Sequence, residues 1–206
     1  MPPPPISVVL FDLGGVVCPF DPAPRLTRLA SLSQLPEHEV QRRICESGLT
    51  ADFDRGRYTS AEWHEIVCKE LGINVTPDEF EDLMLSILTP DLEVLVLVDQ
   101  VRTHTRVAML TDNPPLLLEA IPHRFPELLG RFDPMLFSFQ FQALKPSAEA
   151  FERALARLDA PAHEVLFIDD TAANTEAAAA LGMQTHHFTT AAALEAELRA
   201  RALLDR

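Results

Sequence analysis

The feature that most constrains the fold is a short apolar run, Val8–Phe11, which ends on Asp12 and is followed by Gly14 and Gly15. The run is too short to cross a membrane and is bounded by turn residues, so it predicts a buried β-strand. A strand without polar alternation is typical of a parallel sheet that helices cover on both faces. Asp12 then lies at the carboxyl end of the strand, which is the edge where open α/β sheets bind ligands.

A second apolar run, residues 165–168, also ends on carboxylates, Asp169 and Asp170. Burying unpaired charge is costly, so two strands that both lead into carboxylates are hard to explain by packing alone. A bound cation would explain both. Carboxylate oxygens are ligands for hard cations such as Mg²⁺, and we expect Asp12 and Asp170 to share one.

A third run, residues 107–110, leads into Thr111, Asp112 and Asn113. Thr111 offers a hydroxyl and backbone N–H groups to an anion. Lys145 precedes a predicted helix, and its ammonium and the helix N-terminus would both favour a phosphate. A carboxylate nucleophile, a metal, a hydroxyl and a lysine around one oxyanion together indicate phosphoryl transfer.

Residues 18–90 predict helices and turns without a strand. Helices are expected to begin near Pro24, Pro36, Ser60 and Thr76. After residue 90, strands expected at 107–110, 135–139, 165–168 and 185–188 alternate with helices, the last of which runs to Leu204. This alternation predicts an α/β fold with a doubly wound parallel sheet. We expect a core domain of residues 1–17 and 91–206 with an inserted helical domain of residues 18–90.

Composition excludes several classes of function. The 206-residue chain has a net charge of −14, which argues against binding to nucleic acid or anionic membranes. No apolar run approaches the ~20 residues of a membrane helix, and residues 1–5 do not resemble a secretory signal. Three widely spaced cysteines fit a reducing compartment. We therefore expect a cytoplasmic protein, either a monomer or a homodimer.

The four motifs, in this order, resemble those of the haloacid dehalogenase (HAD) superfamily over nearly the whole chain. Asp12 matches the family's first motif, Thr111 the second, Lys145 the third, and the pair Asp169 and Asp170 the fourth. The helical block after the first strand resembles the family's cap. The resemblance implies a Rossmann-like core and a hydrolase of small phosphorylated metabolites.

The resemblance also assigns roles to residues around the metal. It implies that Asp12 is a nucleophile that forms an aspartyl-phosphate. Asp12, the Gly14 carbonyl and Asp170 would hold Mg²⁺, with Asp169 beside or behind it.

On the phosphate side, the resemblance implies that Thr111 and Lys145 bind the transferring phosphoryl group, so that both join Asp12 as catalytic candidates. Asp112 and Asn113, which follow Thr111 in sequence, complete the candidate phosphate-binding set.

One position departs from the family pattern. The first motif usually carries a second aspartate, the general acid/base, where this chain has Gly14. Asp21, a few residues further on, is a candidate substitute. The expected function is a Mg²⁺-dependent phosphatase. Gly14 favours the alternative of a non-catalytic ligand- or partner-binding protein, and a metal-free haloacid dehalogenase that uses Asp12 is a third possibility.

Overall fold

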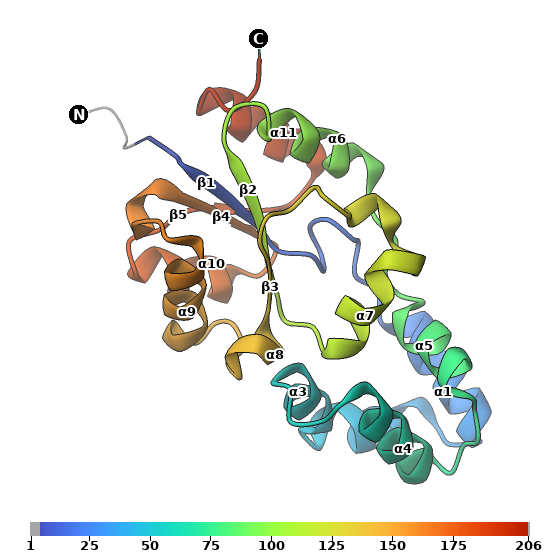
Figure 1. The fold of residues 1–206 in the computed structure, drawn as a ribbon. Helices are drawn as coiled ribbons and strands as arrows, with labels where there is room; N and C mark the ends of the chain where they lie inside the picture. The colour runs from blue at the N-terminus through green and yellow to red at the C-terminus, as the bar shows by residue number, and fades with distance from the viewer. Residues whose placement is uncertain (1–4, 206) are drawn as a thin grey trace.

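A computed structural model describes residues 5–205 of the chain. Five parallel strands form one sheet in the order β3-β2-β1-β4-β5 (Figure 1). The strands are β1 (Val8–Phe11), β2 (Arg106–Thr111), β3 (Met135–Phe137), β4 (Val165–Asp169) and β5 (Gln184–His187). The chain builds outward from β1 through β2 to β3 and then returns to β4 on the other side. This reversal places a topological switch point between β1 and β4, and it confirms the predicted doubly wound α/β fold.

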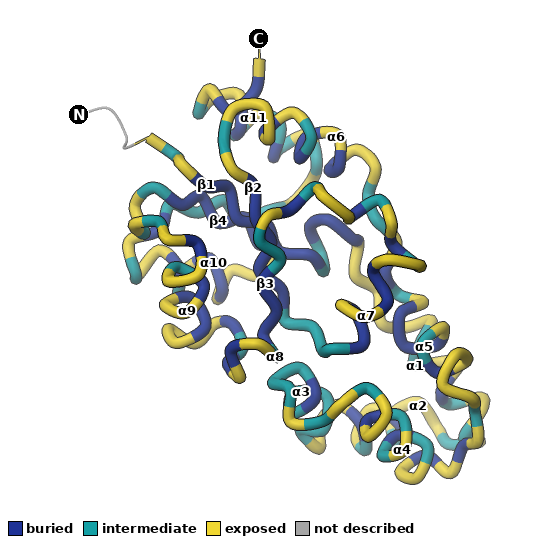
Figure 2. The backbone as a smooth tube through the Cα atoms, viewed as in Figure 1, coloured by how far each residue is buried: buried dark blue, intermediate teal, exposed yellow. Residues whose placement is uncertain are grey.

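Helices cover both faces of the sheet, as the apolar strands predict. They are α6 (Leu92–Val101), α7 (Pro115–Arg124), α8 (Ser138–Phe141), α9 (Ala148–Leu158), α10 (Ala172–Ala180), α11 (Ala191–Ala200) and two 3₁₀ turns, η2 (Pro126–Leu128) and η3 (Ala162–Glu164). Along β1, Val9 and Phe11 pack on the side of α6, α7 and α11, whereas Val8 and Leu10 pack on the side of α9 and α10. The central strands therefore form a buried layer (Figure 2).

The segment between β1 and α6 is helical, as predicted, and its helices gather at one end of the molecule (Figure 1). They are α1 (Ala23–Ser33), α2 (Glu37–Gln41), the π-helix η1 (Arg42–Glu46), α3 (Leu49–Asp54), α4 (Ser60–Leu71) and α5 (Pro77–Leu85). Capping boxes begin α4 and α5, with Thr59 paired to Glu62 and Thr76 paired to Glu79. We call α1–α5 with η1 the helical block; its division from the core at residues 18 and 90 stays a prediction.

Two predicted element ends differ from the structure by two residues or more, and the ends of the other predicted strands agree to within one residue. The third strand ends at Phe137 rather than 139, because Ser138 begins α8 and its hydroxyl donates to the Asp54 carbonyl 2.6 Å away. The last helix ends at Ala200 rather than Leu204, since Ala202 has a left-handed φ of 57°. Apolar periodicity encodes neither a hydrogen bond between residues distant in sequence nor a left-handed φ.

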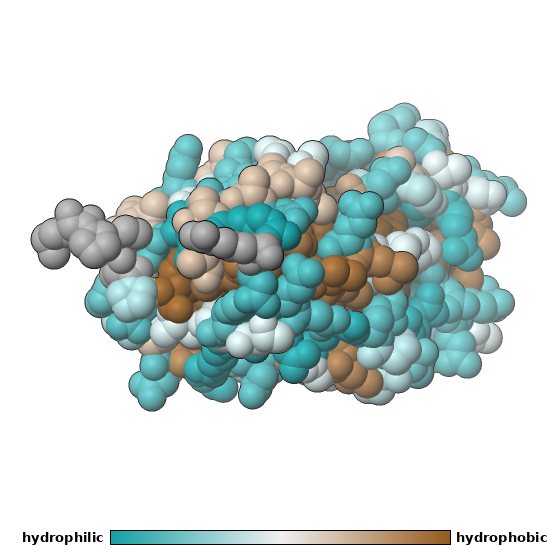
Figure 3. Space-filling model, turned by 90° about the horizontal axis from the view of Figure 1, so that it is seen from above, coloured by the Kyte–Doolittle hydropathy of each residue, from teal (hydrophilic) through white to brown (hydrophobic). Residues whose placement is uncertain are grey.

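The surface agrees with the charged composition. Polar side chains cover most of the face drawn in Figure 3, and apolar residues occupy smaller areas between them. Among residues 5–205, no helix combines the length and the apolar character needed to span a bilayer.

Candidate functional site

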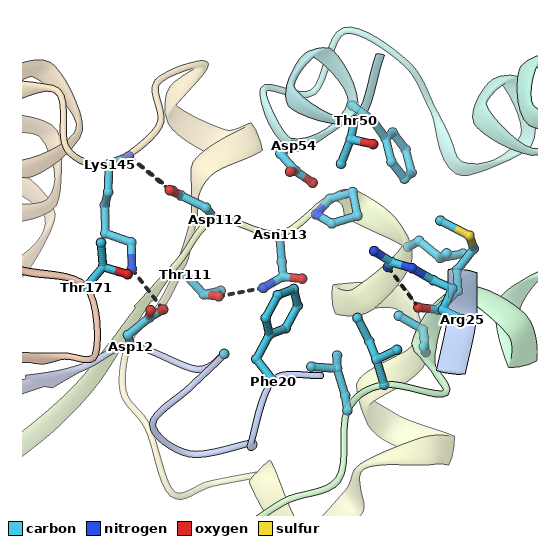
Figure 4. Close-up of a pocket in the computed structure, with 18 of the residues that line it drawn as sticks. Asp12, Phe20, Arg25, Thr50, Asp54, Thr111, Asp112, Asn113, Lys145 and Thr171 are labelled. Atoms are coloured by element: carbon cyan, nitrogen blue, oxygen red, sulfur yellow. Dashed lines mark hydrogen bonds and ion pairs between the residues drawn. The ribbon is translucent and has the colours of Figure 1, made fainter. Parts of the chain in front are cut away.

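The predicted site residues meet at the carboxyl edge of the sheet. Phe11 pairs with Met109 on one side and with Ile168 on the other, so the residues that follow the three strands lie side by side. A cavity of about 290 Å³ opens at this edge. All the sequence-predicted residues except Asp169 and Asp21 line it: Asp12, Gly14, Thr111, Asp112, Asn113, Lys145 and Asp170. Figure 4 shows the cavity between the strand ends and the helical block.

Lys145 is held between two carboxylates at the base of the cavity. Its Nζ lies 2.8 Å from Asp12 Oδ1 and 2.7 Å from Asp169 Oδ2, and its side chain is 2% exposed. Burial acts to lower the Lys145 pKa, but the charges of Asp12 and Asp169 outweigh it and raise that pKa. Lys145 is therefore a fixed cation beside Asp12, as phosphate binding requires.

Asp12 has one oxygen held and one oxygen free. Oδ1 accepts hydrogen bonds from the Leu13 backbone N–H at 2.7 Å and is paired with Lys145. No hydrogen bond or ion pair within residues 5–205 engages Oδ2. Burial raises the pKa of Asp12 to about 7, although the Lys145 ammonium acts in the opposite direction. The carboxylate is thus oriented by one oxygen and can react or coordinate through the other.

The two consecutive aspartates after β4 differ in their surroundings. Asp169 is fully buried and accepts hydrogen bonds from the Thr171 backbone N–H at 2.8 Å and from Asn174 Nδ2 at 3.0 Å, besides its contact with Lys145. Asp170 is exposed at the cavity, and its carboxylate is contacted only by the Thr171 hydroxyl at 3.4 Å within the described chain. Asp169 therefore supports Lys145, whereas Asp170 is open to a ligand.

Three acidic residues at the carboxyl edge of the sheet lie close enough together to hold a cation. Carboxylate oxygens of Asp12, Asp169 and Asp170 lie within 4.8 Å of one another. Gly15 makes room for this approach, because a Cβ there would lie 2.1 Å from Asp170 Oδ2. The φ of Gly15 is also +81°, in the left-handed region that favours glycine. Two open carboxylates in this arrangement fit a hard divalent cation.

Thr111, Asp112 and Asn113 make a small polar network at the end of β2. Asn113 Nδ2 donates to Thr111 Oγ1 at 2.7 Å, which leaves the Thr111 hydroxyl hydrogen available to an anion. The Asp112 carboxylate accepts from the Lys145 backbone N–H at 3.0 Å. Asp112 therefore positions the Lys145 loop, and its negative charge gives its side chain no direct attraction for phosphate.

The helical block supplies two residues that the sequence reasoning missed, Asp54 and Arg25. Both line the cavity, and Figure 4 shows Asp54 across it from Asp12. Burial, followed by the charge of Asp112, raises the pKa of Asp54 to about 7 against the opposing effect of Arg25 and Arg55. Within residues 5–205 the Asp54 carboxylate has no hydrogen bond or ion pair. Asp54 ends α3 and begins the turn Asp54-Arg55-Gly56, which is the sequence signal that could have found it.

The sequence-based candidate for a substitute acid does not reach the cavity. Asp21 is exposed, and its Oδ1 accepts from the Ala23 backbone N–H at the start of α1 at 3.0 Å. Gly14, by contrast, lines the cavity without a left-handed φ, and a Cβ there would meet Phe20 at an ordinary 3.7 Å. The missing carboxylate at position 14 is therefore not imposed by the backbone.

The amino-acid sequence matches a family model and a known phosphatase over most of the chain. Residues 6–182 match the family model of haloacid dehalogenase-like hydrolases. The chain is 26% identical over 196 residues to sesquiterpene phosphatase astK of Aspergillus oryzae, a match covering 94% of this chain and 95% of that protein.

Solved structures share the fold. A predicted HAD-like family hydrolase from Porphyromonas gingivalis superimposes with a TM-score of 0.82 at 25% identity, covering 94% of this chain and 98% of the other. HAD family enzyme bt-2542 from Bacteroides thetaiotaomicron, in complex with magnesium and inorganic phosphate, gives a TM-score of 0.79 at 22% identity, covering 89% and 94%.

Proposed function

Because this chain belongs to the haloacid dehalogenase-like hydrolases, we propose that it is a Mg²⁺-dependent phosphatase of small phosphorylated metabolites. The observation that carries the proposal is the Asp12 carboxylate, oriented by Lys145 at 2.8 Å on the wall of a cavity that Asp170 and Thr111 also line. The relative named as a sesquiterpene phosphatase supports phosphatase chemistry, and the related fold that holds magnesium and phosphate supports the metal.

The reaction uses Asp12 as a nucleophile. The Asp12 carboxylate attacks phosphorus, a new P–O bond forms, and the bond from phosphorus to the ester oxygen breaks with its electron pair leaving on that oxygen. Lys145 and the Thr111 hydroxyl bind the phosphoryl oxygens while charge develops on them. Water then attacks the aspartyl-phosphate, which releases inorganic phosphate and restores the Asp12 carboxylate.

Asp12, Asp170 and the Gly14 carbonyl would hold the Mg²⁺, all three lining the cavity. When bound, the ion neutralises part of the phosphate charge and so lets an anionic nucleophile approach an anionic ester. Asp169 stays outside this set because its oxygens are already bonded to Lys145, Asn174 and the backbone.

Asp54 takes the role that position 14 cannot fill in this chain. A carboxyl with a pKa of about 7 is partly protonated at neutral pH, so it can protonate the departing ester oxygen. The resulting carboxylate then accepts a proton from the attacking water. Asp54 is therefore the general acid/base of the proposed reaction, supplied by α3 rather than by the loop after β1.

The test is phosphate release from p-nitrophenyl phosphate and a panel of phosphorylated metabolites, with chelator and with Mg²⁺. Activity should vanish with chelator and return with Mg²⁺. Activity that survives thorough chelation, together with halide release from a 2-haloacid, would favour the dehalogenase alternative. Stabilisation by a phosphorylated ligand without any turnover would favour a binding protein.

A further inference from the structure

We infer that the substrate carries an apolar organic group, so that the enzyme hydrolyses phosphate esters of alkyl or prenyl-like alcohols in preference to sugar or nucleotide phosphates. This substrate class rests on the proposed phosphatase function and makes it more specific. Once the phosphate is bound, the ester's organic group must lie against the wall of the cavity that faces away from Asp12.

That wall is built almost entirely from apolar side chains. The helical block and the loops flanking it contribute Phe20, Phe53, Trp63, Met84, Leu85 and Leu88. The rings of Phe53 and Trp63 stack with centroids 4.6 Å apart and are 2% and 0% exposed, so this pair forms the rigid backing of the wall rather than its contact surface. A ligand site of this kind binds mainly by excluding water from apolar surface, and a few polar groups fix the orientation.

Four side chains on this wall carry polar groups, namely Arg25, Thr50, Asp54 and Trp63. Two of them have hydrogen-bond partners within the protein. Arg25 Nη1 donates to the Met84 carbonyl at 3.3 Å, and the Thr50 hydroxyl donates to the Ile44 carbonyl at 3.0 Å. A sugar carries several hydroxyls, each of which loses hydrogen bonds to water on entering the cavity. The open polar groups on the wall are the other Arg25 donors, the Asp54 carboxylate, which the proposed reaction uses, and Trp63 Nε1, which is buried. They are fewer than the hydroxyls of a sugar, so part of those losses would go uncompensated and the cavity would discriminate against sugars.

Phe20 provides an independent indication at the mouth of the cavity. It lines the cavity, yet 54% of the residue is exposed to solvent. Figure 4 shows its ring directed into the space between Asn113 and the loop after β1. An apolar chain that leaves the phosphate site along this wall would cover the ring and remove that surface from water.

The experiment compares phosphate monoesters of primary alcohols that differ only in the organic group. Ethyl, butyl, hexyl and octyl phosphate and glucose 6-phosphate have similar leaving oxygens, so differences in kcat/KM report contacts with the wall. We expect kcat/KM to rise about three- to fourfold for each methylene until the cavity is filled. Glucose 6-phosphate should fall below butyl phosphate.

p-Nitrophenyl phosphate separates two ways of failing. If it is hydrolysed while glucose 6-phosphate equals or exceeds octyl phosphate, the apolar substrate class is wrong and the phosphatase function stands. If neither the aryl ester nor any alkyl ester is hydrolysed with Mg²⁺ present, the phosphatase function is wrong and the substrate class falls with it.

A matched pair of variants tests the wall itself. Phe20→Ser and Leu129→Ser each remove a large apolar side chain of similar exposure, 54% and 50%, and only Phe20 lines the cavity. Phe20→Ser should flatten the dependence on chain length, whereas Leu129→Ser should leave the wild-type slope. An unchanged slope in Phe20→Ser, and also in Ile87→Ser on the same wall, would overturn the inference.

Discussion

Gly15 offers the sharpest test of the metal site. Its φ of +81° lies in the left-handed region, and a Cβ built there would lie 2.1 Å from Asp170 Oδ2. Gly15→Ala therefore does two separable things. It places an L-residue in an unfavourable backbone conformation, and it pushes the Asp170 carboxylate away from Asp12. We expect a moderate loss of stability and a larger loss of Mg²⁺ affinity.

The two magnitudes follow from the geometry. A left-handed conformation costs an L-residue about 1–2 kcal/mol. The clash itself adds little to the stability loss, because Asp170 is exposed and can rotate away. For a chain of this size, that cost corresponds to a fall in Tm of about 2–8 °C. Displacing a ligand through its neighbour typically costs about 10–100-fold in metal affinity.

Gly14→Ala is the matched control. A Cβ at position 14 would lie 3.7 Å from Phe20, an ordinary contact, and the backbone there has no left-handed φ. Thermal unfolding in chelator measures the stability change, and calorimetric titration with Mg²⁺ measures the affinity. Gly14→Ala should stay within about 0.5 kcal/mol of wild type. Wild-type Mg²⁺ affinity in Gly15→Ala would refute the assignment of Asp170 as a metal ligand.

Further predictions concern the carboxylates. Asp12→Asn removes the attacking charge, so kcat should fall by several powers of ten while the protein stays folded, and near-native turnover would make Asp12 structural. Asp54→Asn should slow the hydrolysis of alkyl phosphates by about 10²–10⁴-fold and that of aryl phosphates far less. The wild-type kcat should decline above pH ~7, where Asp54 loses its proton, and this decline should be absent in Asp54→Asn. Asp21→Asn should change neither property. Gly14→Asp in the Asp54→Asn background should recover at least about tenfold of the lost rate on alkyl phosphates, since the turn has room for a side chain. No recovery would contradict the proposal that Asp54 replaces an acid missing from position 14. Because the pKa of Asp54 is raised in the folded protein, its protonated form stabilises the fold below pH 3.8, and this contribution of at most about 4 kcal/mol is lost as pH rises through about 7. Asp54→Asn should therefore flatten the pH dependence of the free energy of urea unfolding between pH 4 and 8.

The core of the fold was predictable because its signals are local. Apolar runs that end in polar residues identified β1, β2 and β4, and the parallel arrangement brings their ends to one edge. Lys145 was predictable from its place before a helix, although its ion pairs with Asp12 and Asp169 join residues far apart in sequence. The different roles of Asp169 and Asp170 were not predictable from sequence. They depend on which carboxylate accepts hydrogen bonds from the Asn174 side chain and the Thr171 backbone N–H.

Asp54 escaped prediction because its position is set by packing between the helical block and the core. The Asp54 carbonyl accepts the Ser138 hydroxyl at 2.6 Å, a contact across 84 positions of sequence. Gly56, two residues later, approaches α8 so closely that a Cβ would lie 3.0 Å from the Phe139 carbonyl oxygen. These two contacts fix the turn that presents the Asp54 carboxyl to the cavity. In the proposed reaction, the nucleophile therefore follows strand β1 and the proton donor belongs to the helical block, so the proposed set of reacting groups would be complete only when the block is packed against α8.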